Sequence, residues 1–219
     1  MNKVVSKEYA VSQIPNGATI MSGGFGQVGS PLELIDELYL QGQSELTIIS
    51  NNIGEPGKGL SRLLENGQIK KVIGSYFTSN RIVGQHYLNG ELEVELIPQG
   101  SFAEAIRAGG AGIGGFYTKS SAGTLLGEEK ETKLIDDELY VLQNPLKADF
   151  ALIRAHKADR LGNLIYRKTA RNFNPAMATA VRTVIVEVDE IVEPGSLNPE
   201  SIITQHLYID YIILRGTTL

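Results

Sequence analysis

The feature that most constrains the fold of this chain is a recurring alternation of short β-branched runs with helix-like segments. The runs have the composition of buried strands and cover residues 18–21, 46–50, 72–76, 92–96, 150–153 and 184–188. Strands that alternate with helices are typical of α/β proteins whose sheet is mostly parallel. We therefore predict an open, mostly parallel α/β sheet flanked by helices.

Length and composition agree with one such domain. The chain has 219 residues, of which 42% are hydrophobic, and no shift in composition marks a boundary, so we expect a single domain over residues 1–219. The formal net charge is −5 and the basic residues are scattered, which argues against nucleic-acid binding. Residues 1–8 lack the apolar core of a signal peptide, and no stretch approaches the roughly 18 apolar residues of a membrane span. We therefore expect a cytoplasmic protein without a membrane partner.

Several kinds of chemistry are excluded by the residues that the chain contains. Without cysteine, it has no disulfide, no thiolate zinc site and no cysteine nucleophile. Glu65 precedes Asn66-Gly67, a pair that commonly ends a helix, and we interpret it as part of a C-cap and not as a nucleophile. No metal is expected, because metal-binding spacing is absent from the three histidines, His86, His156 and His206. The sequence therefore offers no convincing nucleophile.

Two segments have the pattern of helices that begin just after a strand. Residues 31–40 follow Ser30 as a candidate N-cap, with Pro31 at the first helical position and Glu33 three residues after the cap. Residues 101–107 form the second predicted helix, with Ser101 as its cap. The loop before each helix lies at the carboxyl end of a predicted strand, which is where open parallel sheets bind ligands.

A glycine-rich insertion follows the second predicted helix. Residues 109–127 have the composition of a loop, although Ile113, Phe116 and Tyr117 are too apolar for a linker. Residues 139–142 have the pattern of a short strand. We predict an irregular insertion that belongs to the domain.

The first candidate ligand loop is Gly23-Gly24-Phe25-Gly26, which lies between a predicted strand and a predicted helix. Glycines permit positive φ and let backbone amides approach a ligand closely, although a glycine cluster alone is more often a tight turn. A nicotinamide site is disfavoured because the next strand ends in Ser50-Asn51-Asn52, without the acidic residue such a site requires. A Walker loop is excluded because no lysine follows Gly29.

Polar side chains follow two further predicted strands. Asn51 and Asn52 end the second strand, and Gln99 lies between Pro98 and Gly100 after the fourth. Each could simply shape a turn, but three such loops at one sheet edge indicate a binding cleft with neutral amide donors. In residues 167–175, the arginines could pair with a phosphate or a carboxylate, or belong to a subunit interface or to a solvated helix start, and the asparagines could fix a turn.

With these motifs, the sequence resembles the A (alpha) subunit of class I coenzyme A transferases, of the 3-oxoacid and acetate–acetoacetate types. The core of the resemblance is the Asn-Gly start, apolar strand, Gly-Gly-Phe, Gly and Pro pattern over residues 16–31. Further similar stretches occur in the same order at residues 98–100, 107–112, 148–155 and 170–174. Ser22 departs from the apolar residue that is usual there, which we expect to adjust packing only.

The resemblance implies a ping-pong transfer of coenzyme A through a glutamyl-CoA thioester, with the glutamate supplied by a B (beta) subunit. This chain would then contain no catalytic nucleophile and would work in an assembly of two A and two B subunits (α2β2). Coenzyme A would be a substrate, and no cofactor would be permanently bound. Substrate binding would fall to Gln99, Asn51 and Asn52, with Gly23, Gly24, Phe25 and Gly26 forming part of the wall.

The same resemblance implies short substrates, namely acetoacetate or another 3-oxo acid, with succinyl-CoA or acetyl-CoA as donor, in ketone-body or short-chain fatty acid metabolism. Succinate, acetate and butyrate would be partner acids. Two alternatives remain at this point. A sugar-phosphate isomerase of the same fold would need its own carboxylate and a phosphate-loop lysine, and no such set is found. A ligand-sensing module would keep the fold without a catalytic partner.

Overall fold

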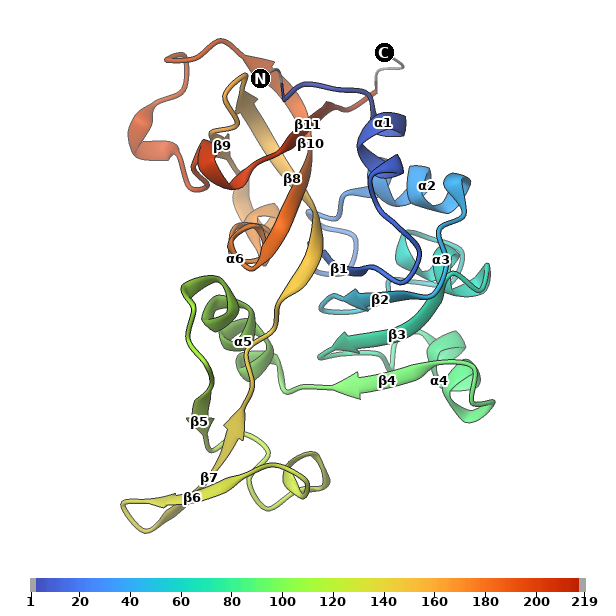
Figure 1. Cartoon of the computed structure of the whole chain (residues 1–219), viewed down its shortest axis with the longest axis vertical. Helices are drawn as coiled ribbons and strands as arrows, with labels where there is room; N and C mark the ends of the chain where they lie inside the picture. The colour runs from blue at the N-terminus through green and yellow to red at the C-terminus, as the bar shows by residue number, and fades with distance from the viewer. Residues whose placement is uncertain (1–2, 217–219) are drawn as a thin grey trace.

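The computed structural model describes residues 3–216 and contains the predicted parallel sheet. Its strand order is β11-β10-β8-β1-β2-β3-β4, with every neighbouring pair parallel, and the short β9 adds antiparallel to β8 (Figure 1). The open, mostly parallel α/β fold is therefore confirmed. The strands are β1 (Thr19–Ser22), β2 (Leu46–Ile49), β3 (Ile69–Gly74), β4 (Glu93–Leu96), β8 (Ala148–Asp159), β9 (Leu164–Ile165), β10 (Val181–Val192) and β11 (Tyr211–Leu214).

Helices cover both faces of this sheet because successive strand residues point to opposite sides. Ile20 and Ile48 pack into one core with α1 to α4, whereas Met21 and Ile49 pack into a second core with α5 and α6. The helices are α1 (Lys7–Ser12), α2 (Leu32–Gln41), α3 (Leu60–Glu65), α4 (Arg81–Leu88), α5 (Gln99–Ala111) and α6 (Asn174–Thr179). The predicted C-cap after Glu65 is confirmed, since α3 ends there and Gly67 has a φ of 69°.

The glycine-rich insertion is more regular than the sequence suggested. Strands β5 (Phe116–Thr118), β7 (Glu138–Gln143) and β6 (Thr132–Ile135) form a small antiparallel sheet in that order. It projects from the main sheet at the lower end of Figure 1. The prediction of an irregular segment was wrong here, although the strand expected at residues 139–142 is present as β7.

Helix α5 also runs further than predicted in both directions. It begins at Gln99, so Ser101 lies inside the helix and does not cap it. It continues through Gly109 and Gly110, which were expected to lie in a loop. A Cβ atom at Gly109 would lie 1.9 Å from the carbonyl oxygen of Leu146, and one at Gly110 would lie 2.1 Å from Thr179 Oγ1. These glycines therefore serve close packing of the helix.

The start of α2 differs from the prediction as well. The helix begins at Leu32, Pro31 occupies the N-cap position, and no side chain from the preceding loop caps it. Its free amides at Glu33 and Leu34 instead donate to the carboxylate of Glu187, at 2.9 and 3.1 Å. The cap that Ser30 was expected to supply thus comes from β10, more than 150 residues further along the chain.

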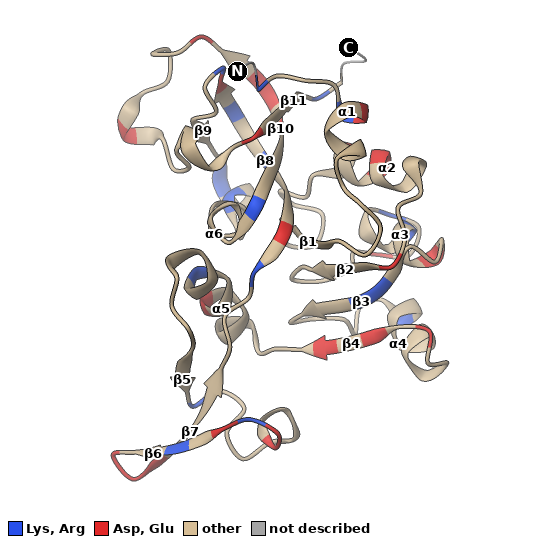
Figure 2. Ribbon diagram, in the orientation of Figure 1, with Lys and Arg blue, Asp and Glu red and all other residues tan. Residues whose placement is uncertain are grey.

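Charged residues are interspersed over the fold, as Figure 2 shows. Strand β4 carries two glutamates beside a basic segment of β3, and Lys71 pairs with Glu95 at 2.8 Å across these strands.

Within residues 3–216, no helix is long and apolar enough to cross a membrane. The same residues contain no group of three or more acidic or histidine side chains arranged to hold a metal ion.

Candidate active site

A cavity of about 550 Å³ lies at the carboxyl ends of β2, β3 and β4, beside the loop that follows β1. The predicted cleft is therefore present in the fold, and four separate loops line it. The lining residues are Phe25, Gly26 and Gln27 after β1, Asn51, Asn52, Gly54 and Glu55 after β2, Ser75, Tyr76 and Ser79 after β3, and Gln99 after β4.

A relay of amide hydrogen bonds fixes the orientation of Gln99. Asn52 Nδ2 donates to Asn51 Oδ1 at 2.8 Å, and Asn51 Nδ2 donates to Gln99 Oε1 at 2.6 Å. The Ser75 hydroxyl also donates to Gln99 Oε1. Since two protein donors occupy this oxygen, the opposite end of the amide, Nε2, is the donor that Gln99 presents to the cavity. No hydrogen bond within residues 3–216 engages that nitrogen.

The two asparagines contribute mainly to the shape of the cavity. Asn51 is buried, and its Nδ2 group also donates to Ser75 Oγ at 2.9 Å. Asn52 accepts a bond from the backbone amide of Gly54 at 2.8 Å, which makes the Asx turn that the sequence allowed. Both asparagines line the cavity, as expected, and substrate contact by either remains a prediction.

The glycine loop is divided between the cavity and the protein interior. Phe25 and Gly26 line the cavity, where the Phe25 side chain is 58% exposed, and the backbones of Phe25 and Val28 exchange hydrogen bonds at 3.0 and 3.2 Å. Gly23 and Gly24 lie behind this turn. A Cβ atom at Gly23 would meet Asn174 Oδ1 at 1.9 Å, and the Gly24 amide donates to Asn172 at 3.1 Å.

Two asparagines from the 167–175 segment hold this loop from behind. Asn174 is fully buried, and its Nδ2 group donates to the carbonyl oxygens of Gly29 and Ala170, both at 3.0 Å. Asn172 Nδ2 donates to the carbonyl oxygen of Val28 at 2.9 Å. The expectation that the asparagines fix a turn is confirmed, and that turn supports the cavity wall.

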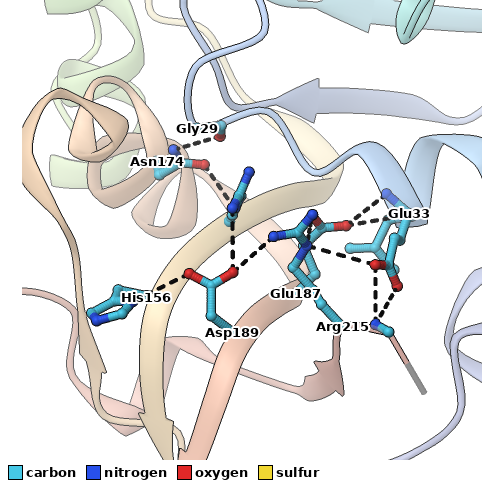
Figure 3. A network of polar contacts seen from close by, with 10 residues as sticks. Gly29, Glu33, His156, Asn174, Glu187, Asp189 and Arg215 are labelled. Carbon is cyan, nitrogen blue, oxygen red and sulfur yellow. Dashed lines mark hydrogen bonds and ion pairs between the residues drawn. The ribbon is translucent and has the colours of Figure 1, made fainter.

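A buried carboxylate anchors the far end of the same loop (Figure 3). Glu187 is fully buried, with Oε2 accepting from the first amides of α2 and Oε1 lying 3.2 Å from Arg215 Nε. Burial raises the pKa of Glu187 to about 7, against the opposing effects of the Leu34 amide and Arg215. The position of α2, and so of the loop before it, therefore depends on a residue of β10.

Asp189 extends this network toward the surface. Arg215 Nη1 lies 2.8 Å from Asp189 Oδ1, Arg154 Nη2 lies 3.2 Å from the same oxygen, and His156 Nδ1 lies 3.1 Å from Oδ2 (Figure 3). Burial raises the pKa of Asp189, but hydrogen bonds from Arg215 and His156 outweigh it and hold the pKa below its ordinary value. His156 is therefore part of a structural ion cluster.

The one carboxylate weighed from the sequence, Glu65, lies outside the cavity. Glu65 accepts bonds from the Gly57 amide and the Ser61 hydroxyl, both at 2.7 Å, and does not line the cavity. Among residues 3–216, Glu55 is the one carboxylate in the cavity lining, and it pairs with Lys58 at 3.3 Å. Glu55 was not singled out from the sequence, and neither were Ser75 and Tyr76, because these two were assigned to the end of a strand.

Comparison with known proteins agrees with this architecture. The profile of the coenzyme A transferase family matches residues 4–215. The chain belongs to the coenzyme A transferase family.

Individual relatives place it with the A subunits of that family. It is 50% identical over 206 residues to the A subunit of the 3-oxoadipate CoA-transferase of Pseudomonas putida, covering 93% of this chain and 89% of that protein. It is 49% identical over 218 residues to the A subunit of a probable succinyl-CoA:3-ketoacid coenzyme A transferase of Bacillus subtilis (strain 168), covering 99% and 92%. The solved glutaconate coenzyme A-transferase of Acidaminococcus fermentans shares the fold, with a TM-score of 0.87 at 20% identity over 97% of this chain and 75% of that one. The resemblance to A subunits is confirmed.

Proposed function

We propose that this chain is the A subunit of a two-subunit coenzyme A transferase that moves coenzyme A from succinyl-CoA or acetyl-CoA to a 3-oxo acid such as acetoacetate. Two relatives of nearly equal identity support the acceptor class, because the names of both specify a 3-oxo acid. Coenzyme A is then a substrate, and no permanently bound cofactor is required. We place the assembly in the cytoplasm, with two A and two B subunits.

The observation that carries the proposal is the amide relay that ends at Gln99. Its Nε2 group is a neutral donor held in place by Asn51 and Ser75 at the wall of a cavity. A preorganised donor of this kind stabilises a developing oxyanion, by roughly 3 kcal/mol in a site closed to water. The B subunit would close the cavity and supply the nucleophile.

The proposed reaction proceeds through two covalent intermediates on a glutamate of the B subunit. The glutamate carboxylate attacks the thioester carbonyl, coenzyme A leaves as a thiolate, and an acyl-glutamyl anhydride forms. The thiolate then attacks the glutamyl carbonyl, which releases the first acid and leaves a glutamyl-CoA thioester. The acceptor carboxylate repeats these steps in reverse and leaves as its CoA ester. Gln99 donates to the carbonyl oxygen of the acyl group at the tetrahedral stages that form at the acyl carbon.

The test is reconstitution with a cognate B subunit. We expect this chain, purified alone, to exchange no coenzyme A between acetoacetate and succinyl-CoA or acetyl-CoA. The reconstituted complex should catalyse this exchange, and borohydride added after acyl-CoA should inactivate the B subunit. Full activity from this chain alone would refute the proposal that the B subunit supplies the nucleophile. A complex that binds the acids without transfer would indicate a ligand-sensing module.

A further inference from the structure

Three asparagines of this chain are followed directly by glycine, at residues 16–17, 66–67 and 89–90. In such a pair the glycine backbone nitrogen can attack the side-chain amide carbon of the asparagine, because glycine has no side chain to hinder the approach. A succinimide ring forms as ammonia leaves, and water then opens the ring to aspartate or isoaspartate. The dipeptide is the same at all three positions, so the surroundings of each pair decide where the reaction occurs.

Two of the pairs occupy the same position in the same kind of turn. Asn66 and Asn89 are the C-cap residues of α3 and α4, with φ and ψ of −89° and 6° in the first and −77° and −9° in the second. The glycine after each has a left-handed backbone, with a φ of 69° at Gly67 and 75° at Gly90. Each glycine amide donates to a carbonyl oxygen of the last helical turn, at 3.0 and 3.1 Å. The two pairs therefore differ in their surroundings and not in their backbone geometry.

The side chain of Asn66 is held in place, whereas that of Asn89 is free. Asn66 Nδ2 donates to Gln68 Oε1 at 3.0 Å, and Gln68 is itself buried and donates to two backbone carbonyl oxygens. Asn89 is exposed, and its side-chain amide has no hydrogen-bond partner among residues 3–216. Asn16 is exposed as well, but its Oδ1 accepts from the Ser44 amide at 2.9 Å. Of the three, Asn89 can turn its amide carbon toward the glycine without breaking a side-chain hydrogen bond.

The two helices also differ in how firmly they are packed. In α3, four of the six residues are buried, whereas in α4 the buried residue is Val83, one of eight. Since the capped turn commits the glycine amide to a hydrogen bond, attack requires the last turn of the helix to open. Local opening costs less free energy where fewer apolar contacts are lost. The end of α4 should therefore open more readily than the end of α3.

We infer that Asn89 is a site of spontaneous deamidation in this protein, and that the reaction proceeds through opening of the last turn of α4. The Gly90 nitrogen gives up its proton to hydroxide and bonds to Asn89 Cγ, the Cγ–Nδ2 bond breaks, and ammonia leaves after water returns the proton. Water then adds at Cγ to give aspartate, or at the main-chain carbonyl carbon to give isoaspartate. Both products place a carboxylate at the C-terminal end of α4, which the helix dipole disfavours. The inference does not depend on the proposed function.

The test follows all three pairs in the purified full-length chain, incubated at mildly alkaline pH in water labelled with heavy oxygen. Peptide mass spectrometry measures the labelled, deamidated fraction at each asparagine, and the label excludes molecules that react later, during digestion. The same chain in denaturant gives the intrinsic rate of each pair. Relative to these intrinsic rates, we expect Asn89 to react about tenfold faster than Asn16 or Asn66 in the folded chain.

Variants test the opening step and the assignment to Asn89. Gly84→Ala should stabilise α4, because a Cβ atom there meets open space, and should slow the reaction at Asn89 by about twofold to fivefold. The rates at Asn16 and Asn66 should not change. Asn89→Gln keeps the amide but would have to form a larger ring, which is slower, so this variant should lose most of the isoaspartate that an isoaspartyl methyltransferase detects. Asn66→Gln is the matched control and should retain it.

The inference would be overturned by a relative rate at Asn16 or Asn66 that equals or exceeds the rate at Asn89. An Asn89 that reacts in denaturant but not in the folded chain would overturn it as well. An unchanged rate at Asn89 in Gly84→Ala would show that the reaction does not proceed through opening of α4.

Discussion

At the scale of single residues, the site depends on which atom of an amide is free. Gln99 lies at the first position of α5, and its side-chain oxygen is occupied by Asn51 and Ser75. These bonds fix the rotation of the amide, so that in the proposed reaction Nε2 would meet the substrate without further reorganisation. In that proposal Asn51 and Ser75 act through Gln99 as positioning residues.

Replacing Gln99 tests this assignment. In the reconstituted complex, Gln99→Ala should lower kcat by more than about tenfold, because a donor to the oxyanion is worth roughly 3 kcal/mol. Steady-state exchange between acetoacetate and an acyl-CoA measures the effect. Gln205→Ala makes the same chemical change at an exposed residue outside the cavity lining and should leave the rate unchanged. An unaltered rate in Gln99→Ala would leave Gln99 as a residue of the turn only.

At the scale of elements, the loop between β1 and α2 is held by segments distant in sequence. Asn172 and Asn174 bind its backbone from the α6 side, and Glu187 binds the first amides of α2 from β10. Gly23 must lack a side chain because Asn174 approaches so closely. Buried and partly buried hydrogen bonds thus support the loop that places Phe25 in the cavity lining.

Crowding behind this loop can be tested by adding a single methyl group. Gly23→Ala would place its Cβ atom 1.9 Å from Asn174 Oδ1, and we expect it to lower the free energy of unfolding by roughly 1–3 kcal/mol. Gly84, in α4, has open space around it and provides the matched control. Gly84→Ala should raise the free energy of unfolding by about 0.5–1 kcal/mol, since alanine favours the helix. Denaturant unfolding measures the free energy of unfolding of both variants. The same change in that free energy for Gly23→Ala and Gly84→Ala would contradict the close packing of Gly23 against Asn174.

At the scale of the whole molecule, Glu187 joins three distant segments. It belongs to β10, caps α2 and faces Arg215, which follows β11. The carboxylate is fully buried, and its environment favours the neutral form more than water does. Stability of the fold should therefore respond to the protonation of this one group.

The sign of that response follows from the raised pKa. Between pH 4.5 and about 7, the folded state holds a proton that the unfolded state has lost, so stability falls as pH rises through this window. A rise in pKa of this size corresponds to on the order of 3 kcal/mol. The free energy of unfolding of wild type, measured relative to Glu187→Gln, should decrease by up to that amount across the window and stay level above it.

Chemical denaturation at a series of pH values provides the measurement. Glu190→Gln is the control, because Glu190 lies on the same strand but is exposed and pairs with Lys157 at 2.6 Å. This variant retains Glu187 and should keep the wild-type pH dependence. Parallel curves for wild type and Glu187→Gln would show that burial does not raise the pKa of Glu187.

Local sequence patterns were sufficient to predict much of the fold and the position of the cleft. The β-branched runs marked the main parallel strands, because alternation and composition are properties of short segments. Polar residues at the ends of those runs then predicted a cleft, since parallel strands bring their carboxyl ends to one edge. For the same reason Gln99 and Asn51 could be placed together, although 48 residues separate them.

The remaining features were decided only by the tertiary structure. Sequence could not show that Glu187, and not Ser30, caps α2, or that Asn174 contacts Gly29 across 145 residues. It also could not show that Gly23 and Gly24 serve packing while Phe25 and Gly26 line the cavity. These assignments depend on contacts between segments far apart in the chain, which local propensity does not encode. The sequence by itself determined three of the four loops that line the cavity, and the packing of distant segments decided which atoms of those loops remain free to bind.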